Sequence, residues 1–99
     1  MALPRSDFES ILPFLFFTKI LHDKRDEFRV YLKSQGIDTG IHWQPGHSFK
    51  LFAHCKRGDL TITEKISKQI VSLPLHSKMA DDDLDKVLKA ANDFGRYGI

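Results

Sequence analysis

The sequence predicts an α/β or α+β fold, with a small sheet covered by helices. Short apolar or extended segments alternate with segments of helical periodicity, in the order strand, helix, strand, short helix, helix, strand, helix. The composition agrees, because 41% hydrophobic and 28% charged residues are ordinary for a globular chain. With 99 residues the chain can build a single modest core. We expect one domain at 13–99, preceded by a tail or the remnant of a connection at 1–12.

The first part of this domain should hold a strand and a helix. Residues 13–20 are almost all bulky and apolar, and a run this short predicts a buried strand. In the helix that follows, Asp23 can cap the first turn, and the next acidic residues suit the positive end of the helix dipole. Gly36 should end this helix in the left-handed conformation, which would let Ile37 pack back on Leu32 as in a Schellman motif.

The middle of the chain should alternate between a short strand, turns and a helix. Residues 39–43 are expected to form the strand, followed by a turn at 44–47 and one helical turn at 49–52. Thr-Ile-Thr-Glu at 61–64 matches a capping box, which predicts the start of a helix. The isoleucines behind this start are spaced four apart, at Ile62, Ile66 and Ile70.

The last third predicts an extended segment and a final helix. Residues 71–75 should be extended, and Pro74 makes this an edge or terminating strand. The aspartates from Asp81 onward should open the helix, because acids suit a helix start. Phe94 and Gly95 should close it. Its apolar stripe is expected to consist of Leu84, Val87, Leu88 and Ala91.

Charge and cysteine content exclude several classes of function. A net charge of +2, with basic residues scattered among acidic ones, does not favour binding to nucleic acid or to an anionic membrane. The single cysteine, Cys55, excludes an internal disulfide and fits a reducing compartment. The apolar stretch at 11–17 is too short to span a bilayer and lacks the features of a signal peptide. We therefore expect a cytoplasmic protein.

The segment 36–47 has the most unusual composition in the chain. It combines glycines, Trp43, Pro45 and two histidines, His42 and His47. Irregular loops after regular elements often carry binding groups, and imidazole suits proton transfer or contacts to phosphate and hydroxyl groups. An alternative is that Trp43 belongs to the core and that both histidines are loop residues bonded to the backbone.

Other chemistry is poorly supported. A metal site built from His42, His47, His54 and Cys55 has no compact zinc spacing, so we expect no metal. Cys55 lacks a base placed to activate it, because its sequence neighbour His54 should point elsewhere. No lysine sits in a glycine-rich, apolar setting suited to Schiff-base chemistry. We expect several to lie on polar helix faces, namely Lys33, Lys65, Lys68, Lys86 and Lys89.

The segment 36–47 resembles the DegT/DnrJ/EryC1/StrS aminotransferases. That family commonly shows Gly-Ile-x-Thr-x-x-His, then an aromatic residue, a proline and another histidine. The likeness continues in the same order from about residue 14 to residue 94. Its further motifs are Arg25-Asp26 at a helix start, Gly58 to Glu64 at another, Ser72-Leu73-Pro74-Leu75, and Asp82-Asp83-Leu84 with Val87.

The resemblance implies a specific chemistry. Members are pyridoxal-phosphate (PLP) dependent transaminases of fold type I, usually homodimers, which transfer an amino group from glutamate or glutamine to a keto-sugar carried on a nucleotide. Their products enter surface polysaccharides, lipopolysaccharide or glycosylated antibiotics. The cofactor lysine and the other cofactor-binding residues lie in a large N-terminal domain. The chain looks like the small C-terminal domain alone, so we expect it to hold no cofactor, to be inactive by itself and to have that large domain or a second subunit as its partner.

The resemblance also assigns site residues. His42 matches the first histidine of the family loop, Trp43 an aromatic that is more often tyrosine, and His47 the second histidine, so these three are expected to contact the sugar or phosphate groups of the substrate. Trp43 and Gly46 depart from the usual pattern, and Ala80 replaces a serine or threonine cap. An alternative is a stand-alone interaction or regulatory module that reuses this domain. Without its partner, the domain should expose apolar surface and self-associate.

Overall fold

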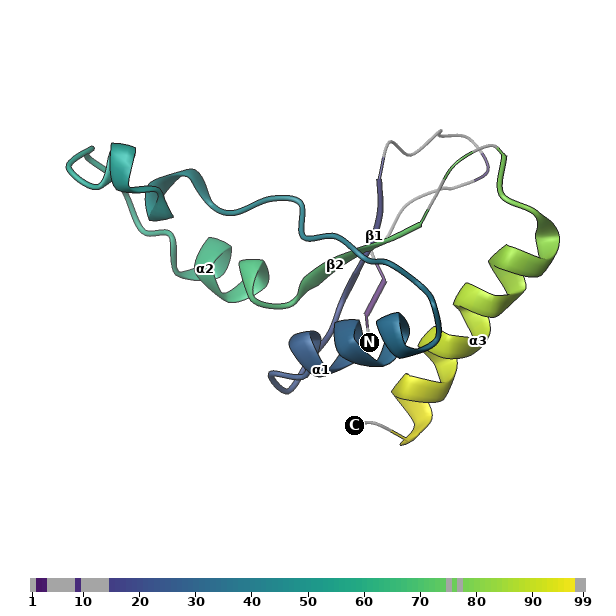
Figure 1. Cartoon of the computed structure of the whole chain (residues 1–99). Helices are drawn as coiled ribbons and strands as arrows, with labels where there is room; N and C mark the ends of the chain where they lie inside the picture. Colours follow the sequence, from purple (N-terminus) through teal and green to yellow (C-terminus); the bar gives the residue numbers. More distant parts are fainter. Residues whose placement is uncertain (1, 4–8, 10–14, 75, 77, 98–99) are drawn as a thin grey trace.

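Two short antiparallel strands lie at the centre of the molecule (Figure 1). The computed structural model describes residues 2–3, 9, 15–74, 76 and 78–97. Strand β1 (Phe16–Lys19) pairs with β2 (Ile70–Leu73), so that Phe16 lies opposite Leu73. Isolated bridges extend the pairing to Ala2 beside β1 and to Gly40 beside β2. The α+β architecture expected from the sequence is confirmed.

Both predicted strands at the centre are confirmed over part of their length. Positions 13–14 and 75 lie outside the described residues, as does most of 1–12, so the domain boundary stays a prediction. The expected strand at 39–43 is wrong. Only Gly40 pairs with β2, because the chain leaves the sheet after this single bridge and a strand needs several successive backbone partners.

Helices α1 (Arg25–Ser34) and α3 (Asp81–Tyr97) enclose the core with the sheet (Figure 1). Phe28 of α1 meets Phe94 of α3 edge to face, with ring centroids 5.2 Å apart. Such a pair adds about 1 kcal/mol to the effect of burial. The buried apolar residues are Ile20, Phe28, Leu32, Ile37, Val71, Val87, Ala90, Ala91 and Phe94.

The predicted end of α1 is confirmed in detail. Gly36 has a φ of 79°, its N–H donates to the carbonyl of Lys33, and the N–H of Ile37 donates to the carbonyl of Leu32 at 2.9 Å. These two bonds are those of the Schellman motif, and Ile37 is buried. The predicted Asp23 cap is wrong. Asp23 has a φ of 55°, and Lys24 occupies the cap position without a side-chain bond.

Helix α3 begins at Asp81 as predicted, but its end and its stripe differ. Phe94 and Gly95 do not close the helix, which continues to Tyr97, since burial of Phe94 holds this turn in place and one glycine costs a helix only about 1 kcal/mol. The expected stripe is only half buried, because Leu84 and Leu88 are exposed. The buried face is instead formed by Val87, Ala90, Ala91 and Phe94.

Residues 44–69 form an arm that extends away from the sheet (Figure 1). The arm holds two 3-10 turns, η1 (Gly46–Ser48) and η2 (Lys50–Phe52), and the helix α2 (Thr61–Ser67). The helical turn predicted at 49–52 is confirmed as η2, whereas the turn predicted at 44–47 overlaps η1 only at positions 46–47. At its base, Nη1 of Arg25 donates to the carbonyl of Ser67 and ties the arm to α1.

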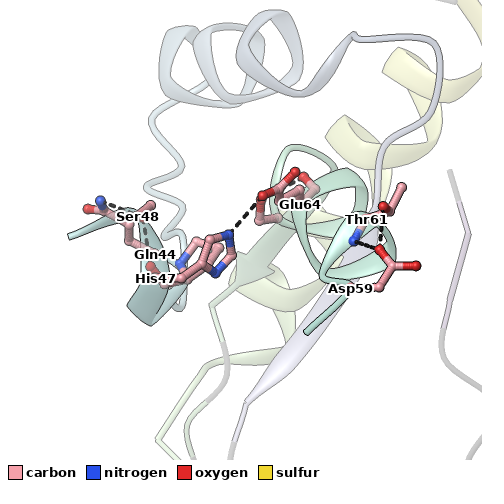
Figure 2. A network of polar contacts seen from close by, with 8 residues as sticks. Gln44, His47, Ser48, Asp59, Thr61 and Glu64 are labelled. Carbon is pink, nitrogen blue, oxygen red and sulfur yellow. Dashed lines mark hydrogen bonds and ion pairs between the residues drawn. The ribbon is translucent and has the colours of Figure 1, made fainter. Parts of the chain in front are cut away.

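The capping box predicted at 61–64 is wrong in its details. Thr61 is the first helical residue, and Oδ1 of Asp59 accepts hydrogen bonds from the backbone N–H and the hydroxyl of Thr61, at 3.0 and 2.6 Å (Figure 2). Asp59 therefore starts α2. In a capping box the side chain of Glu64 would bond to the backbone at the helix start. Here its carboxylate contacts the imidazole of His47 instead.

Candidate functional site

His42 is held against β2 by a side-chain contact to Ser72. Nδ1 of His42 lies 2.9 Å from Oγ of Ser72, and Ser72 is only 6% exposed. Gly40 forms the floor under the ring, because a Cβ at position 40 would lie 2.5 Å from Cε1 of His42. Gly40 and Ser72 also exchange two backbone hydrogen bonds, of 3.1 and 2.8 Å. This backbone pairing fixes Gly40 and Ser72 relative to each other, and these two residues define the position of the His42 ring.

His42 lines a hollow of about 410 Å³ beside β2. This volume lies within the range of small-molecule sites. Arg29 of α1 fixes the rim by donating to the hydroxyl and the carbonyl of Thr39, at 2.9 and 3.2 Å. Asp38 supplies a carboxylate, and no lysine or arginine is found among the described lining residues. These are Leu15, Phe16, Asp38, Thr39, Gly40, His42, Ser72, Leu73 and Pro74.

Trp43 lies beside His42 but outside the core. Its side chain is among the exposed ones, at 66%, and the two ring centroids are 5.3 Å apart at an interplanar angle of 70°. The alternative that Trp43 is a core residue is therefore wrong. The indole offers a wide apolar surface next to the imidazole.

His47 lies in the arm, at a second hollow. Nε2 of His47 is 3.0 Å from Oε1 of Glu64, which links η1 to α2 (Figure 2). The hollow measures about 380 Å³ and differs in charge from the first, since Arg57 and Lys68 line it. Its other described lining residues are Pro45, His47, Ser48, Glu64 and Ser67.

The structure thus brings two of the three expected site residues together. His42 and Trp43 adjoin, whereas His47 lines a different hollow. Both imidazoles bond to side chains, which differs from the alternative of loop histidines bonded to the backbone. Sequence reasoning missed Ser72 as a site residue because it lies thirty positions further along the chain. Its place in the family-like Ser-Leu-Pro-Leu motif was the available signal.

None of the described lysines is buried as a Schiff-base lysine would be. A lysine that forms a Schiff base is desolvated in an apolar pocket, and all lysines of the chain are described and exposed or half-buried. In the same described part of the chain, no three His, Cys, Asp or Glu side chains gather in a way that could hold a metal ion. No described helix is long and apolar enough to cross a membrane.

This fold occurs in solved aminotransferases. The aminotransferase TlmJ from Streptoalloteichus hindustanus superimposes with a TM-score of 0.78 at 21% identity, over 86% of this chain and 23% of that chain. A DegT DnrJ EryC1 StrS aminotransferase from Brucella abortus gives a TM-score of 0.77 at 23% identity, over 94% of this chain and 26% of that chain. The fold is that of part of an aminotransferase.

The chain belongs to the DegT/DnrJ/EryC1/StrS aminotransferase family, whose family model matches residues 3–92. Among curated relatives, the dTDP-3-amino-3,6-dideoxy-alpha-D-galactopyranose transaminase of Aneurinibacillus thermoaerophilus is 33% identical over 73 residues. The alignment covers 73% of this chain and 20% of that relative. The chain therefore spans about a fifth of the length of the enzyme it matches.

Proposed function

We propose that this chain is the C-terminal, substrate-holding part of a PLP-dependent nucleotide-sugar aminotransferase. The whole enzyme would transfer an amino group from glutamate or glutamine to a keto-sugar, for surface polysaccharide or amino-sugar biosynthesis, in the cytoplasm. Family membership supports the reaction class, and the sugar-nucleotide named for the relative from Aneurinibacillus supports the substrate class. PLP, when bound in the remainder of the enzyme, supplies the electron sink that transamination needs.

The observation that carries the proposal is the hollow beside β2, which His42 lines, with the indole of Trp43 next to that imidazole. Its described lining is mostly apolar and carries one carboxylate, that of Asp38, without a balancing lysine or arginine. A carboxylate disfavours a phosphate, whereas it accepts hydrogen bonds from hydroxyl groups. We assign the sugar to this hollow. Trp43 would cover the apolar face of the sugar ring with its exposed indole.

His47 would serve the phosphate groups of the same substrate. Arg57 and Lys68 line its hollow and favour an anion, and pairing with Glu64 fixes the orientation of the imidazole. His47 follows His42 by five positions, so their Cα atoms are at most about 18 Å apart. One elongated ligand, with a sugar at one end and phosphate groups further along, can reach both.

The test is an NMR titration of the isotope-labelled chain with dTDP-glucose. We expect shifts at 38–43 and 72–74, and weaker ones around His47. His42→Ala should weaken binding by about tenfold, the effect of losing one hydrogen bond and its packing. His54→Ala is the matched control, because His54 is exposed and lines neither hollow. Equal binding by the two variants would refute the site, and binding of a protein partner without any sugar would support the regulatory-module alternative.

A further inference from the structure

The contact between His42 and Ser72 bears on which nitrogen of the imidazole carries its proton. A neutral imidazole has one N–H and one bare nitrogen, and a serine hydroxyl can donate or accept. At 2.9 Å, Nδ1 of His42 and Oγ of Ser72 share one hydrogen, which belongs to one of them. In one arrangement Nε2 carries the proton and offers the hollow a hydrogen-bond donor, and in the other Nε2 is bare and offers an acceptor.

Burial of Ser72 favours one arrangement. Ser72 is 6% exposed, and the hydroxyl of so little exposed a serine usually finds its hydrogen-bond partner within the protein. Among the described residues, Nδ1 of His42 is the partner of this side chain. If Nδ1 carried the proton, the hydroxyl hydrogen would have no acceptor there. This favours a serine that donates to Nδ1, with the proton of the ring on Nε2.

Gly40 keeps the ring in this place. A Cβ at position 40 would lie 2.5 Å from Cε1 and 3.2 Å from each ring nitrogen of His42. The paired backbones of Gly40 and Ser72 fix the distance between floor and hydroxyl. Any larger residue at position 40 would have to push the imidazole off the serine.

We propose that Ser72 and Gly40 are positioning residues that hold His42 in its Nε2–H form, so that the ring presents a hydrogen-bond donor to the hollow beside β2. Nε2 has no partner among the described residues, so this donor is available to a ligand. The ligand group it takes is an acceptor, such as a keto, ring or hydroxyl oxygen of a sugar. The nature of the ligand rests on the proposed function, whereas the position of the proton does not.

The first experiment records long-range ¹H–¹⁵N spectra of the histidine rings without ligand, at a pH where the rings are neutral. For His42 we expect a protonated Nε2 and an Nδ1 that accepts a hydrogen bond. In Ser72→Ala both nitrogens should move toward the values of His54, which is exposed and is expected to exchange freely between its tautomers. Ser72→Thr keeps the hydroxyl and should restore the parent signals.

Matched controls separate this role from a general loss of structure. Ser34→Ala removes another serine hydrogen bond, to the carbonyl of Tyr31, and should leave His42 unchanged. Gly40→Ala should reproduce the effect of Ser72→Ala, whereas Gly46→Ala, which places a Cβ in open space, should not. A protonated Nδ1 in the parent chain, or signals that are identical in Ser72→Ala, would overturn the proposal.

The second experiment repeats the dTDP-glucose titration with these variants. Ser72→Ala should weaken binding about threefold to tenfold, the usual effect of one hydrogen bond, and Ser72→Thr should recover it. If the ring has the expected proton but the nucleotide-sugar does not bind, the proposed function fails and the positioning role stands. If the nucleotide-sugar binds while Nδ1 carries the proton, the positioning role fails and the proposed function stands.

Discussion

Gly36 holds a backbone conformation that residues with a Cβ adopt at a cost. Its φ of 79° lets α1 stop and brings Ile37 back onto Leu32. This feature could be predicted from the sequence because every group involved lies within six residues. The prediction that Asp23 caps α1 was wrong although it also concerns a few neighbouring residues. His22 and Asp23 both have positive φ, and nothing in the sequence indicates this.

We predict that Gly36→Ala lowers the free energy of unfolding by about 1–2 kcal/mol, the cost of placing a Cβ in the left-handed region. The new methyl would lie 3.3 Å from Nζ of Lys86, a flexible chain end that can move, so the backbone carries the loss. Urea unfolding measures the change. Gly58→Ala is the matched control, since nothing lies within 4 Å of its Cβ position. Equal stability of the two variants would contradict the prediction.

At the scale of elements, local pattern and tertiary context contribute differently. The helices and the two paired strands could be predicted from the periodicity of apolar residues and from the residues that start or end an element, which are local signals. The expected strand at 39–43 and the end of α3 at Phe94 failed because both depend on distant contacts, namely the brief pairing of Gly40 with β2 and the packing of Phe94 on Phe28. The site follows the same division. The residue types of His42 and Trp43 indicated binding, but only the fold shows that Ser72 supports His42.

The start of α2 should respond to acid. The hydroxyl and then the backbone N–H of Thr61 donate to Asp59 and lower the pKa of its carboxyl below its ordinary value of 3.8. Because the pKa is lower in the folded state, the carboxylate supports the helix above pH 3.8, and this support is lost as the pH falls through the folded-state pKa.

We expect the amide signals of α2 to report fraying in that acidic range, as measured by NMR during a pH titration. Thr61→Val removes the hydroxyl donor and should move the pKa of Asp59 back toward 3.8. Asp59→Ala should fray the helix at all pH values. An Asp59 titration that is the same with and without the Thr61 hydroxyl would refute this account.

At the scale of the whole molecule, the arm is tied to α1 at its base by Arg25 but buries no residue against the rest of the described chain. None of its residues is buried, and a helix as short as α2 has little stability of its own. Large apolar side chains are exposed along and beside it: Trp43, Phe49, Leu51, Phe52, Ile62 and Ile66. An exposed apolar surface of this kind suits an interface with another protein segment or with a second copy of the chain.

We predict that the chain self-associates at high concentration and that Leu51→Lys or Ile62→Lys weakens this association. The two side chains are 83% and 73% exposed, and burial of each would contribute about 1.5–3 kcal/mol, or roughly a tenfold to hundredfold change in the dimer constant. Sedimentation velocity measures it. Val30→Lys is the control, because Val30 is 70% exposed but lies on α1. An equal effect of Val30→Lys would place the interface elsewhere.

The chain alone should form no specific aldimine with PLP. No described lysine is buried, so addition of PLP should give no stoichiometric aldimine absorption band, and borohydride should trap label scattered over exposed lysines. Mass spectrometry of tryptic peptides checks the distribution. A single lysine that is fully labelled at equimolar PLP would show that this chain holds the cofactor itself.

The pairing of β1 with β2 has a consequence for the order of folding. Phe16 can pair with Leu73 only after the whole arm has been synthesised, and Phe28 can pack on Phe94 only after α3 has been synthesised. Closing so long a loop costs entropy before any contact of the sheet compensates for it. A growing chain therefore keeps Phe28 and Leu32 uncovered until α3 leaves the ribosome. During that interval both side chains are open to chaperones.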